Sequence, residues 1–256
     1  YRFLDVFLNS PLGEFTLSYK KKNRSIIAYC IGLPRSGTHT IVNKFKSNIK
    51  AQHEPLVRSD LRTIINNKKK KQVFKYLYNK DLYLNLELEA SHYLIYFIEH
   101  LVKINPEAKY ILTIRNPRKW IQSYFKMLNN MNEKKGYWLE YEKLKLNENN
   151  LLINNYKYRK QLIKELLYYY SWHVNKMINM IDNPNLLIID THYINSSDQK
   201  IAKFLNISTE SIKKNIIASN TPFKEKIIFS EEEECIIKKF DSKFYQRLLT
   251  NYNVTN

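Results

Sequence analysis

The chain has 256 residues, with 42 Lys or Arg against 24 Asp or Glu, and a formal net charge of +18. This length suits one α/β domain with a substantial core, and no linker rich in Pro, Gly or Ser divides it, so we expect a single domain over residues 1–256. No apolar run is long enough for a membrane span, and two isolated cysteines indicate neither a disulfide framework nor a zinc site.

The N-terminal quarter predicts a strand, a tight loop and a helix. Residues 1–24 predict at most an edge extension of the sheet, whereas residues 26–31 form an apolar run typical of a buried strand. Gly32 and Gly37 then bracket a loop whose backbone can closely approach an anion. A helix opens at Thr38, and its free amides and dipole favour a negative charge in front of it.

This loop differs from the phosphate-binding loop of kinases and NTPases. Gly32 and Gly37 have the G-x-x-x-x-G-K-[ST] spacing, but Thr38 and His39 stand where Lys and Ser/Thr are needed. The loop's own cation is Arg35, inside the turn. The loop can therefore hold one phosphate-like group, but it lacks the usual residues for a magnesium-bound triphosphate.

The middle of the chain predicts further strands and a second anion site. We expect strands over residues 48–52, 82–88 and 109–114, with helical segments to about residue 79 and over 91–103. Pro117 suits the first turn of a helix that follows the last of these strands. Arg115 precedes that helix and Ser123 lies two turns into it, so both can face a phosphate, which a guanidinium binds through paired hydrogen bonds.

The C-terminal half is mostly helical. Residues 156–181 predict a long helix, within a helical insertion over 131–182 that we expect on the acceptor side. A strand over 186–189 follows, and Ser230 is placed to cap a helix whose first turn holds four glutamates. Alternating strands and helices predict an α/β fold, a parallel sheet flanked by helices on both faces, with a ligand at the carboxyl ends of the strands.

Two motifs carry a family resemblance. The loop GLPRSGTHT resembles the 5′-phosphosulfate loop G-x-P-R-S-G-T-T of sulfotransferases, including tyrosylprotein and bacterial members, and Arg115-Asn-Pro with Ser123 resembles their 3′-phosphate motif. A softer match covers residues 185–208, so the resemblance spans roughly residues 25–208. It implies a P-loop-like fold and metal-independent, in-line transfer of a sulfuryl group from 3′-phosphoadenosine 5′-phosphosulfate (PAPS) to a hydroxyl acceptor, leaving 3′-phosphoadenosine 5′-phosphate (PAP).

The resemblance also implies site residues. Arg35 would neutralise charge on the oxygen between phosphorus and sulfur, and Lys224 would reach the 3′-phosphate from a late basic segment, although that segment lacks the family's Arg-Lys-Gly. Thr40 stands where small cytosolic relatives have a Trp that stacks on adenine, so adenine must be held differently. The cofactor contacts it implies are Pro34, Arg35, Ser36, Gly37, Thr38, His39, Thr40, Arg115, Ser123 and Lys224.

The transfer needs a base for the acceptor hydroxyl. Glu54 is the first choice, because tyrosylprotein sulfotransferases carry their base at a similar distance after the loop, and burial beside an anion should raise its pKa. His53 has a suitable ordinary pKa but, as a neighbour at a strand end, is expected to point the opposite way. Glu89 with His92 is the third candidate.

Two other function classes stay open from the sequence. One is a divergent P-loop kinase, and the other is a basic, non-enzymatic protein that binds nucleic acid, which we favour less as a partner. The acceptor could be a sugar, lipid, polyketide, small phenol or peptide tyrosine. We expect a cytoplasmic location, while the chain's start without Met leaves a removed leader or anchor open.

Overall fold

The computed structural model of the chain describes residues 26–66, 69–131, 156–209 and 227–252, together with residues 6–8, 10, 12, 13, 16 and 254. Within these residues, one sheet of parallel strands has the order β2-β3-β1-β4-β5. The strands are β1 (Ala28–Cys30), β2 (Ala51–His53), β3 (Leu88–Ala90), β4 (Lys109–Ile114) and β5 (Leu186–Asp190). The predicted α/β fold is confirmed. Because the strands all run the same way, the segments that follow them meet at one edge.

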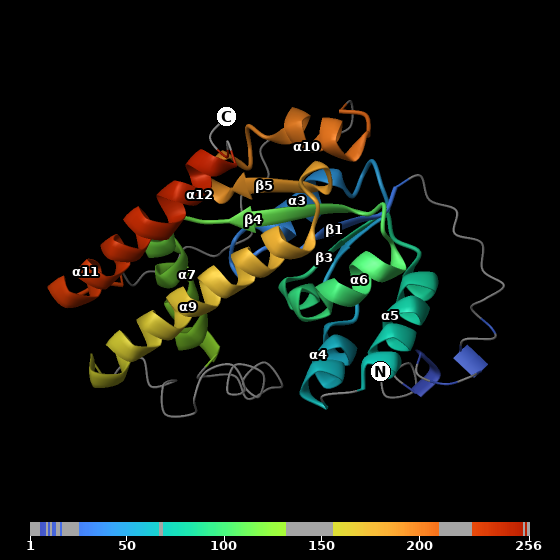
Figure 1. Cartoon of the computed structure of the whole chain (residues 1–256), viewed down its shortest axis with the longest axis horizontal. Coiled ribbons are helices and arrows are strands. Elements are labelled where there is room, and N and C mark those ends of the chain that lie inside the picture. The colour runs from blue at the N-terminus through green and yellow to red at the C-terminus, as the bar shows by residue number, and fades with distance from the viewer. Residues whose placement is uncertain are drawn as a thin grey trace.

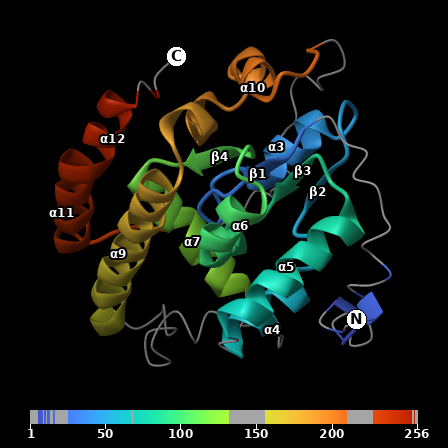
Figure 2. The same cartoon turned by 45° about the vertical axis from the view of Figure 1, so that its right-hand side comes forward.

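The helices flank this sheet on both sides (Figures 1 and 2). In both views α9 and α11 lie side by side along one flank. The helices are α3 (Thr38–Phe45), α4 (Val57–Ile65), α5 (Lys70–Leu84), α6 (Ile98–Ile104), α7 (Pro117–Met131), α9 (Tyr156–Met180), α10 (Asp198–Leu205), α11 (Glu231–Phe240) and α12 (Gln246–Asn251). Shorter turns are η1 (His92–Phe97), η3 (Asn183–Asn185), η4 (Thr191–Tyr193) and η5 (Asp241–Tyr245).

Two cores cover the two faces of the sheet, because successive side chains of a strand point to opposite sides. Tyr29 of β1 joins Tyr110 and Leu112 of β4 in the larger core, under helices that include α5, α6, α7 and α9. Ala28 and Cys30 face the smaller core, which α3 and α10 cover. This double burial explains why the first strand is apolar at every position.

The third strand is shorter and later than the sequence predicts. Residues 82–84 end α5, and β3 begins only at Leu88. Asn85 adopts a left-handed φ of 47°, which stops the helix, and Asn is one of the few residues that accept this conformation readily. A short apolar run does not by itself distinguish the end of a buried helix from a strand. β2 is likewise displaced, to Ala51–His53, and the helix predicted over 91–103 begins as the 3₁₀ turn η1.

The elements around Arg115 and in the C-terminal half follow the prediction closely. β4, α9 and β5 occupy the expected ranges within a residue or so, α7 begins at Pro117 as expected, and Ser230 forms a capping box with Glu233 at the start of α11. Of the predicted insertion over 131–182, residues 132–155 lie outside the described residues, as do most of residues 1–24, where an edge extension is expected. One face of α9 is buried at Leu162, Leu166, Tyr169, His173 and Met177, and Ile181, just after the helix ends, is buried as well.

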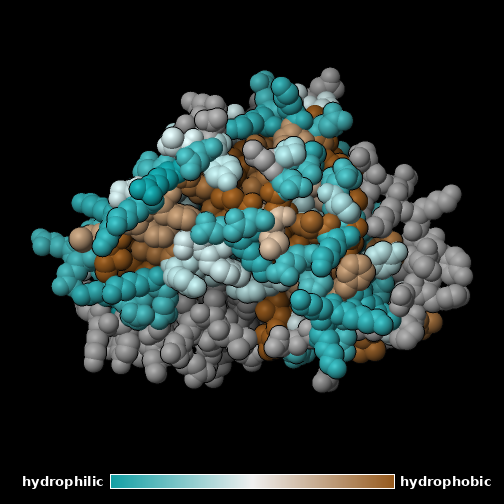
Figure 3. Space-filling model, viewed as in Figure 1, coloured by the Kyte–Doolittle hydropathy of each residue, from teal (hydrophilic) through white to brown (hydrophobic). Residues whose placement is uncertain are grey.

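The outer face of α9 and α11 carries part of the excess positive charge. Figure 3 shows hydrophilic rows flanking an apolar strip there. This strip coincides with a shallow groove. Its lining includes the apolar residues Leu167, Ile236 and Phe240 and several lysines. Among the described helices, none combines the length and hydrophobicity needed to cross a bilayer.

Candidate active site

Residues 32–37, which we call the glycine loop, form a tight turn after β1. A Cβ added at Gly32 would lie 1.7 Å from the Thr113 hydroxyl oxygen, so only glycine fits there. Gly37 has a φ of 96°, and Arg35 has the left-handed φ of 64° that L-residues seldom adopt. The positive φ at Arg35 costs backbone energy, so the surrounding structure must hold the loop in this shape.

Buried side chains from several elements hold the glycine loop. The Trp120 indole of α7 donates to the Pro34 carbonyl oxygen at 2.7 Å. His173 Nε2 of α9 lies 3.1 Å from the Ile31 carbonyl oxygen, and the Tyr169 hydroxyl lies 3.3 Å from its Nδ1, which assigns the ring proton to Nε2. The Thr191 hydroxyl of η4 lies 2.7 Å from the Ser36 carbonyl oxygen. Side chains of α7, α9 and η4 therefore hold the loop together.

Two of the predicted loop contacts point inward. The Ser36 side chain is fully buried, with its hydroxyl 2.5 Å from the Leu33 carbonyl oxygen and 2.8 Å from Thr113 Oγ1. Its backbone N–H also donates to Leu33. Ser36 therefore shapes the loop, and the hydroxyl donation to a phosphate that the sequence suggests is not available in this arrangement. Pro34 helps to hold the loop in place through its carbonyl oxygen, which accepts the Trp120 hydrogen bond.

The two predicted anion motifs meet in space. Arg35 Nε lies 3.4 Å from Ser123 Oγ, and Arg115 Nη1 donates to the Arg35 carbonyl oxygen at 3.2 Å. The Tyr170 hydroxyl of α9 in turn donates to the Arg115 carbonyl oxygen at 2.9 Å. Burial lowers the pKa of both guanidiniums, and at Arg115 the nearby charge of Arg35 lowers it further, but arginine stays charged in proteins. Two half-buried positive side chains therefore lie close together.

The first turn of α3 contacts the end of β2. Thr38 Oγ1 lies 3.1 Å from His53 Nε2, and His39 is exposed, with its Nδ1 3.0 Å from the Asn43 amide nitrogen. The His39 and His53 rings make an edge contact at 5.1 Å between centroids. Thr40 is half-buried on the same turn. The predicted cofactor contacts Thr38, His39 and Thr40 therefore all lie on the first turn of α3, directly after the glycine loop.

Glu54 pairs with His92, which the sequence did not predict. Glu54 Oε1 lies 3.0 Å from His92 Nδ1 and 4.0 Å from His53 Nε2. His53 and Glu54 were expected to point apart, but Glu54 has a φ of 50°, and this turn of the backbone brings both side chains to the same place. Burial raises the pKa of Glu54, yet the hydrogen bond and charge of His92 outweigh it, so the pKa is lowered rather than raised as expected.

Glu89 is separated from His92 and belongs to a buried ion cluster. Lys80 Nζ lies 2.6 Å from Glu89 Oε1 and 2.8 Å from Asp60 Oδ2, and the Tyr76 hydroxyl donates to Asp60. Burial raises the pKa of Glu89, while the Lys80 charge opposes that rise. A carboxylate held this way joins α5 to β3 and is a poor candidate for a base that must meet a substrate.

The burial of His53 has a consequence for stability in acid. Burial lowers the pKa of His53 from 6.5 to about 4, so the folded protein keeps this ring neutral while the unfolded chain takes up a proton. The neutral ring therefore contributes fully to the stability of the fold above pH 6.5, and this contribution is lost as the pH falls toward about 4. We expect the free energy of unfolding to fall by about 2 kcal/mol from this residue between pH ~7 and ~5.

Urea titrations of the parent and of His53→Asn, which retains a side chain able to bond Thr38, would measure this loss. The variant should lose about 2 kcal/mol less over the same interval. An identical loss in both proteins would show that His53 does not titrate this way.

One predicted contact, Lys224, lies outside the described residues. The residues that hold the glycine loop were not singled out from the sequence as loop contacts. Thr113, a hydroxyl inside an apolar strand, was a visible signal, since a buried polar side chain needs a partner. Trp120 and His173 also carry polar groups on the buried faces of their helices, but nothing local in the sequence places them against this loop.

A family model described as a sulfotransferase domain matches residues 28–210. The chain belongs to the sulfotransferase family. The crystal structure of a sulfotransferase from Alicyclobacillus acidocaldarius has a similar fold, with a TM-score of 0.54 at 15% identity, over 90% of this chain and 97% of that chain. At that identity the likeness concerns the fold alone. No curated protein matches the chain in sequence. The family assignment favours sulfotransfer over the kinase and nucleic-acid alternatives.

Proposed function

We propose that this sulfotransferase uses PAPS as the donor and moves its sulfuryl group to a hydroxyl acceptor by in-line displacement. The observation that carries the proposal is the meeting of the two motifs, with Arg35 Nε 3.4 Å from Ser123 Oγ. The 5′ and 3′ positions of one ribose are neighbours, so a donor with a phosphate on each needs two anion sites side by side. A mononucleotide without a 3′-phosphate would use only one of them.

The residues fit that donor at both phosphates. The glycine loop and the first turn of α3 would hold the 5′-phosphosulfate through Arg35, the Gly37 backbone and Thr38, with His39 or Thr40 assisting, because a helix N-terminus behind a glycine turn favours an anion. Arg115 and Ser123 would bind the 3′-phosphate. Lys224 remains part of the proposal as a third 3′ contact.

We assign proton removal to the pair of His92 and Glu54. With Nδ1–H donated to Glu54 Oε1 at 3.0 Å, the His92 ring carries its basic lone pair on Nε2, which can take the acceptor hydroxyl's proton. The lowered pKa of Glu54 makes its carboxylate the weaker base and suits it to orient the ring and stabilise the charged imidazolium. His53, with a pKa of about 4, is less suited to hold a proton.

Arg35 supplies the electrostatic part of the reaction. The donor substrate brings an electrophilic sulfur, whose bond to the bridging phosphate oxygen breaks as the acceptor oxygen attacks. The guanidinium of Arg35 would neutralise the charge that develops on that oxygen, which ends as a phosphate oxygen of PAP. We propose a metal-independent reaction, since Arg35 takes the place of the Lys and magnesium of P-loop kinases. The sequence and fold leave the acceptor open among hydroxyl compounds.

Calorimetric titration with PAP and with adenosine 5′-phosphate tests the donor. We expect PAP to bind about a hundredfold more tightly, since a buried, charge-assisted contact to the extra phosphate is worth a few kcal/mol. Arg115→Ala should abolish most of that difference. Equal affinity for the two ligands would count against the donor, magnesium-dependent turnover of ATP would favour a kinase, and steeply salt-dependent oligonucleotide binding without PAP binding would favour a nucleic-acid protein.

A further inference from the structure

The turn η4 begins at the edge of the sheet where the segments that follow the strands meet. Asp190 ends β5 and pairs with Ile114 at the end of β4, and Thr191 comes next in the chain. The Thr191 hydroxyl lies 2.7 Å from the Ile114 carbonyl oxygen and 2.7 Å from the Ser36 carbonyl oxygen. One side chain therefore contacts both the strand end that leads into Arg115 and the glycine loop.

Both contacted carbonyl groups belong to peptide units that lead into proposed phosphate ligands. No peptide bond among the described residues is cis. In a planar trans unit the C=O and N–H bonds point in opposite directions, so a contact that fixes the oxygen also fixes the N–H. The Ser36 oxygen faces Thr191, so the Gly37 N–H, which we assign to the 5′-phosphosulfate, points to the opposite side. The Ile114 oxygen fixes in the same way the peptide unit through which the chain enters Arg115.

The Thr191 hydroxyl has a single proton for these two acceptors. Carbonyl oxygens accept hydrogen bonds and cannot donate them, so Ser36 and Ile114 share that proton. Trp120, by contrast, donates to one carbonyl oxygen of the loop, that of Pro34. Removing the Thr191 hydroxyl would therefore take a donor from two peptide units at once.

The turn that carries Thr191 is itself firmly held. One carboxylate oxygen of Asp190 accepts the His192 N–H at 2.8 Å and caps η4, and the other accepts the Tyr245 hydroxyl of η5. Both Asp190 and Tyr245 are buried. On its other side η4 packs against Gly37, where an added Cβ would lie 3.6 Å from the Thr191 methyl carbon. The hydroxyl therefore has a fixed place between the two carbonyl groups.

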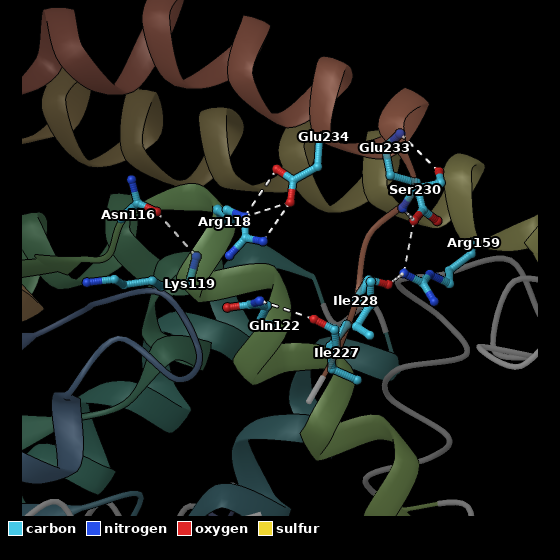
Figure 4. A network of polar contacts seen from close by, with 10 residues as sticks. All are labelled: Asn116, Arg118, Lys119, Gln122, Arg159, Ile227, Ile228, Ser230, Glu233 and Glu234. Carbon is cyan, nitrogen blue, oxygen red and sulfur yellow. Dashed lines mark hydrogen bonds and ion pairs between the residues drawn. The ribbon is translucent and has the colours of Figure 1, made fainter. Parts of the chain in front are cut away.

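The backbone around Arg115 is held on both sides. The Arg115 carbonyl oxygen accepts the Tyr170 hydroxyl at 2.9 Å. At the start of α7 the Asn116 side-chain oxygen accepts the Lys119 N–H at 3.3 Å (Figure 4). Thr191 supplies the contact on the strand side, through Ile114. Among these contacts, only that of Thr191 also includes the glycine loop.

We infer that Thr191 is a positioning residue that couples the two proposed phosphate sites. Its hydroxyl sets the direction of the Gly37 N–H on the 5′ side and the entry of the chain into Arg115 on the 3′ side. This role rests on the proposed donor, whose two phosphates need both sites together. Loss of the hydroxyl should weaken the grip on the 5′-phosphate and, in addition, reduce the gain that the 3′-phosphate brings.

Calorimetric titration with PAP and with adenosine 5′-phosphate tests the coupling in Thr191→Val and Thr191→Ser. Valine has the shape of threonine without the hydroxyl, and Thr191 is only half-buried, so the valine variant is expected to fold. We expect it to bind adenosine 5′-phosphate about fivefold more weakly and to lower the ratio of PAP affinity to adenosine 5′-phosphate affinity about fivefold as well, as for one neutral hydrogen bond lost on each side. Thr191→Ser keeps the hydroxyl and should restore both values.

A matched control and a ligand-free measurement accompany the titrations. Thr63 is buried in α4, and its hydroxyl donates to the Ser59 carbonyl oxygen of the same helix at 2.9 Å, so Thr63→Val makes the same chemical change elsewhere and should alter neither affinity. In the protein without ligand, the carbonyl carbon resonances of Ser36 and Ile114 should both move upfield in Thr191→Val, because each oxygen loses a hydrogen bond, and should return in Thr191→Ser.

The outcomes separate the donor from the coupling. A parent ratio near one would reject the proposed donor, and the role of Thr191 with it. If the parent favours PAP, equal losses for the two ligands in Thr191→Val would overturn the coupling alone, as would an unchanged adenosine 5′-phosphate affinity or a shift of only one carbonyl resonance. Thermal unfolding would show that the variants are folded. Should Thr191→Val not fold, Thr191→Ala, which places no methyl group against the two oxygens, takes its place with the same expectations.

Discussion

Arg35→Met is expected to lower kcat about a thousandfold, because the change removes the positive group that we propose neutralises the charge developing on the bridging oxygen. Methionine is close in size to the arginine stem, and the loop is held by contacts of Pro34, Ser36 and Thr113 that do not involve the Arg35 side chain. The variant should therefore fold and still bind PAP within about tenfold of the parent. Sulfate transfer from PAPS to a panel of hydroxyl acceptors, with PAP titration alongside, would measure both effects.

Two controls sharpen this prediction. Lys46→Met removes an exposed charge just after α3 and should leave kcat unchanged, which excludes an effect of net charge. Arg35→Lys should recover most of the activity, since a lysine at this position can supply the same charge. If Arg35→Met keeps kcat and loses only PAP affinity, Arg35 acts in binding and not in the transfer step.

His92→Ala is expected to lower kcat about a thousandfold, whereas Glu54→Gln should lower it about tenfold. Glutamine can present its amide oxygen to the His92 Nδ1–H, so we expect the ring to stay oriented and the loss to be that of the charge that would stabilise the imidazolium. The contact at issue is the 3.0 Å one between Glu54 Oε1 and His92 Nδ1. Single-turnover measurements of sulfate transfer would report the chemical step without product release.

The two variants distinguish the candidate bases. If Glu54→Gln is as inactive as His92→Ala, the carboxylate is essential to proton removal, which contradicts the mild effect expected here. His53→Asn serves as the control, because it lies in the same cluster, 4.0 Å from Glu54, without an assigned proton transfer. It should change kcat by less than about tenfold.

Much of this protein can be predicted from its sequence. Gly32, Gly37 and Arg35 predict the anion loop, and Arg115, Pro117 and Ser123 predict the second anion site, because strand-loop-helix boundaries and phosphate chemistry are both local properties of the chain. β4 and α7 were predicted in the right places for the same reason. The third strand was misplaced because the short apolar run before Asn85 fits either a buried helix end or a strand.

The tertiary structure decided which of the candidate site residues lie together. Glu89 and His92 lie three residues apart, yet Lys80 binds one and Glu54 binds the other, because partners are chosen by the order of strands in the sheet and not by distance along the chain. The same holds for Ser36, whose hydroxyl lies near that of Thr113 on the neighbouring strand, and for Arg159, which donates to the Ile228 carbonyl oxygen 69 residues away. The residue types in a local motif indicate which side chains could belong to a site. Which of them act together depends on pairing across the sheet and on the burial of charge, and both arise from contacts that the chain makes only after it has folded.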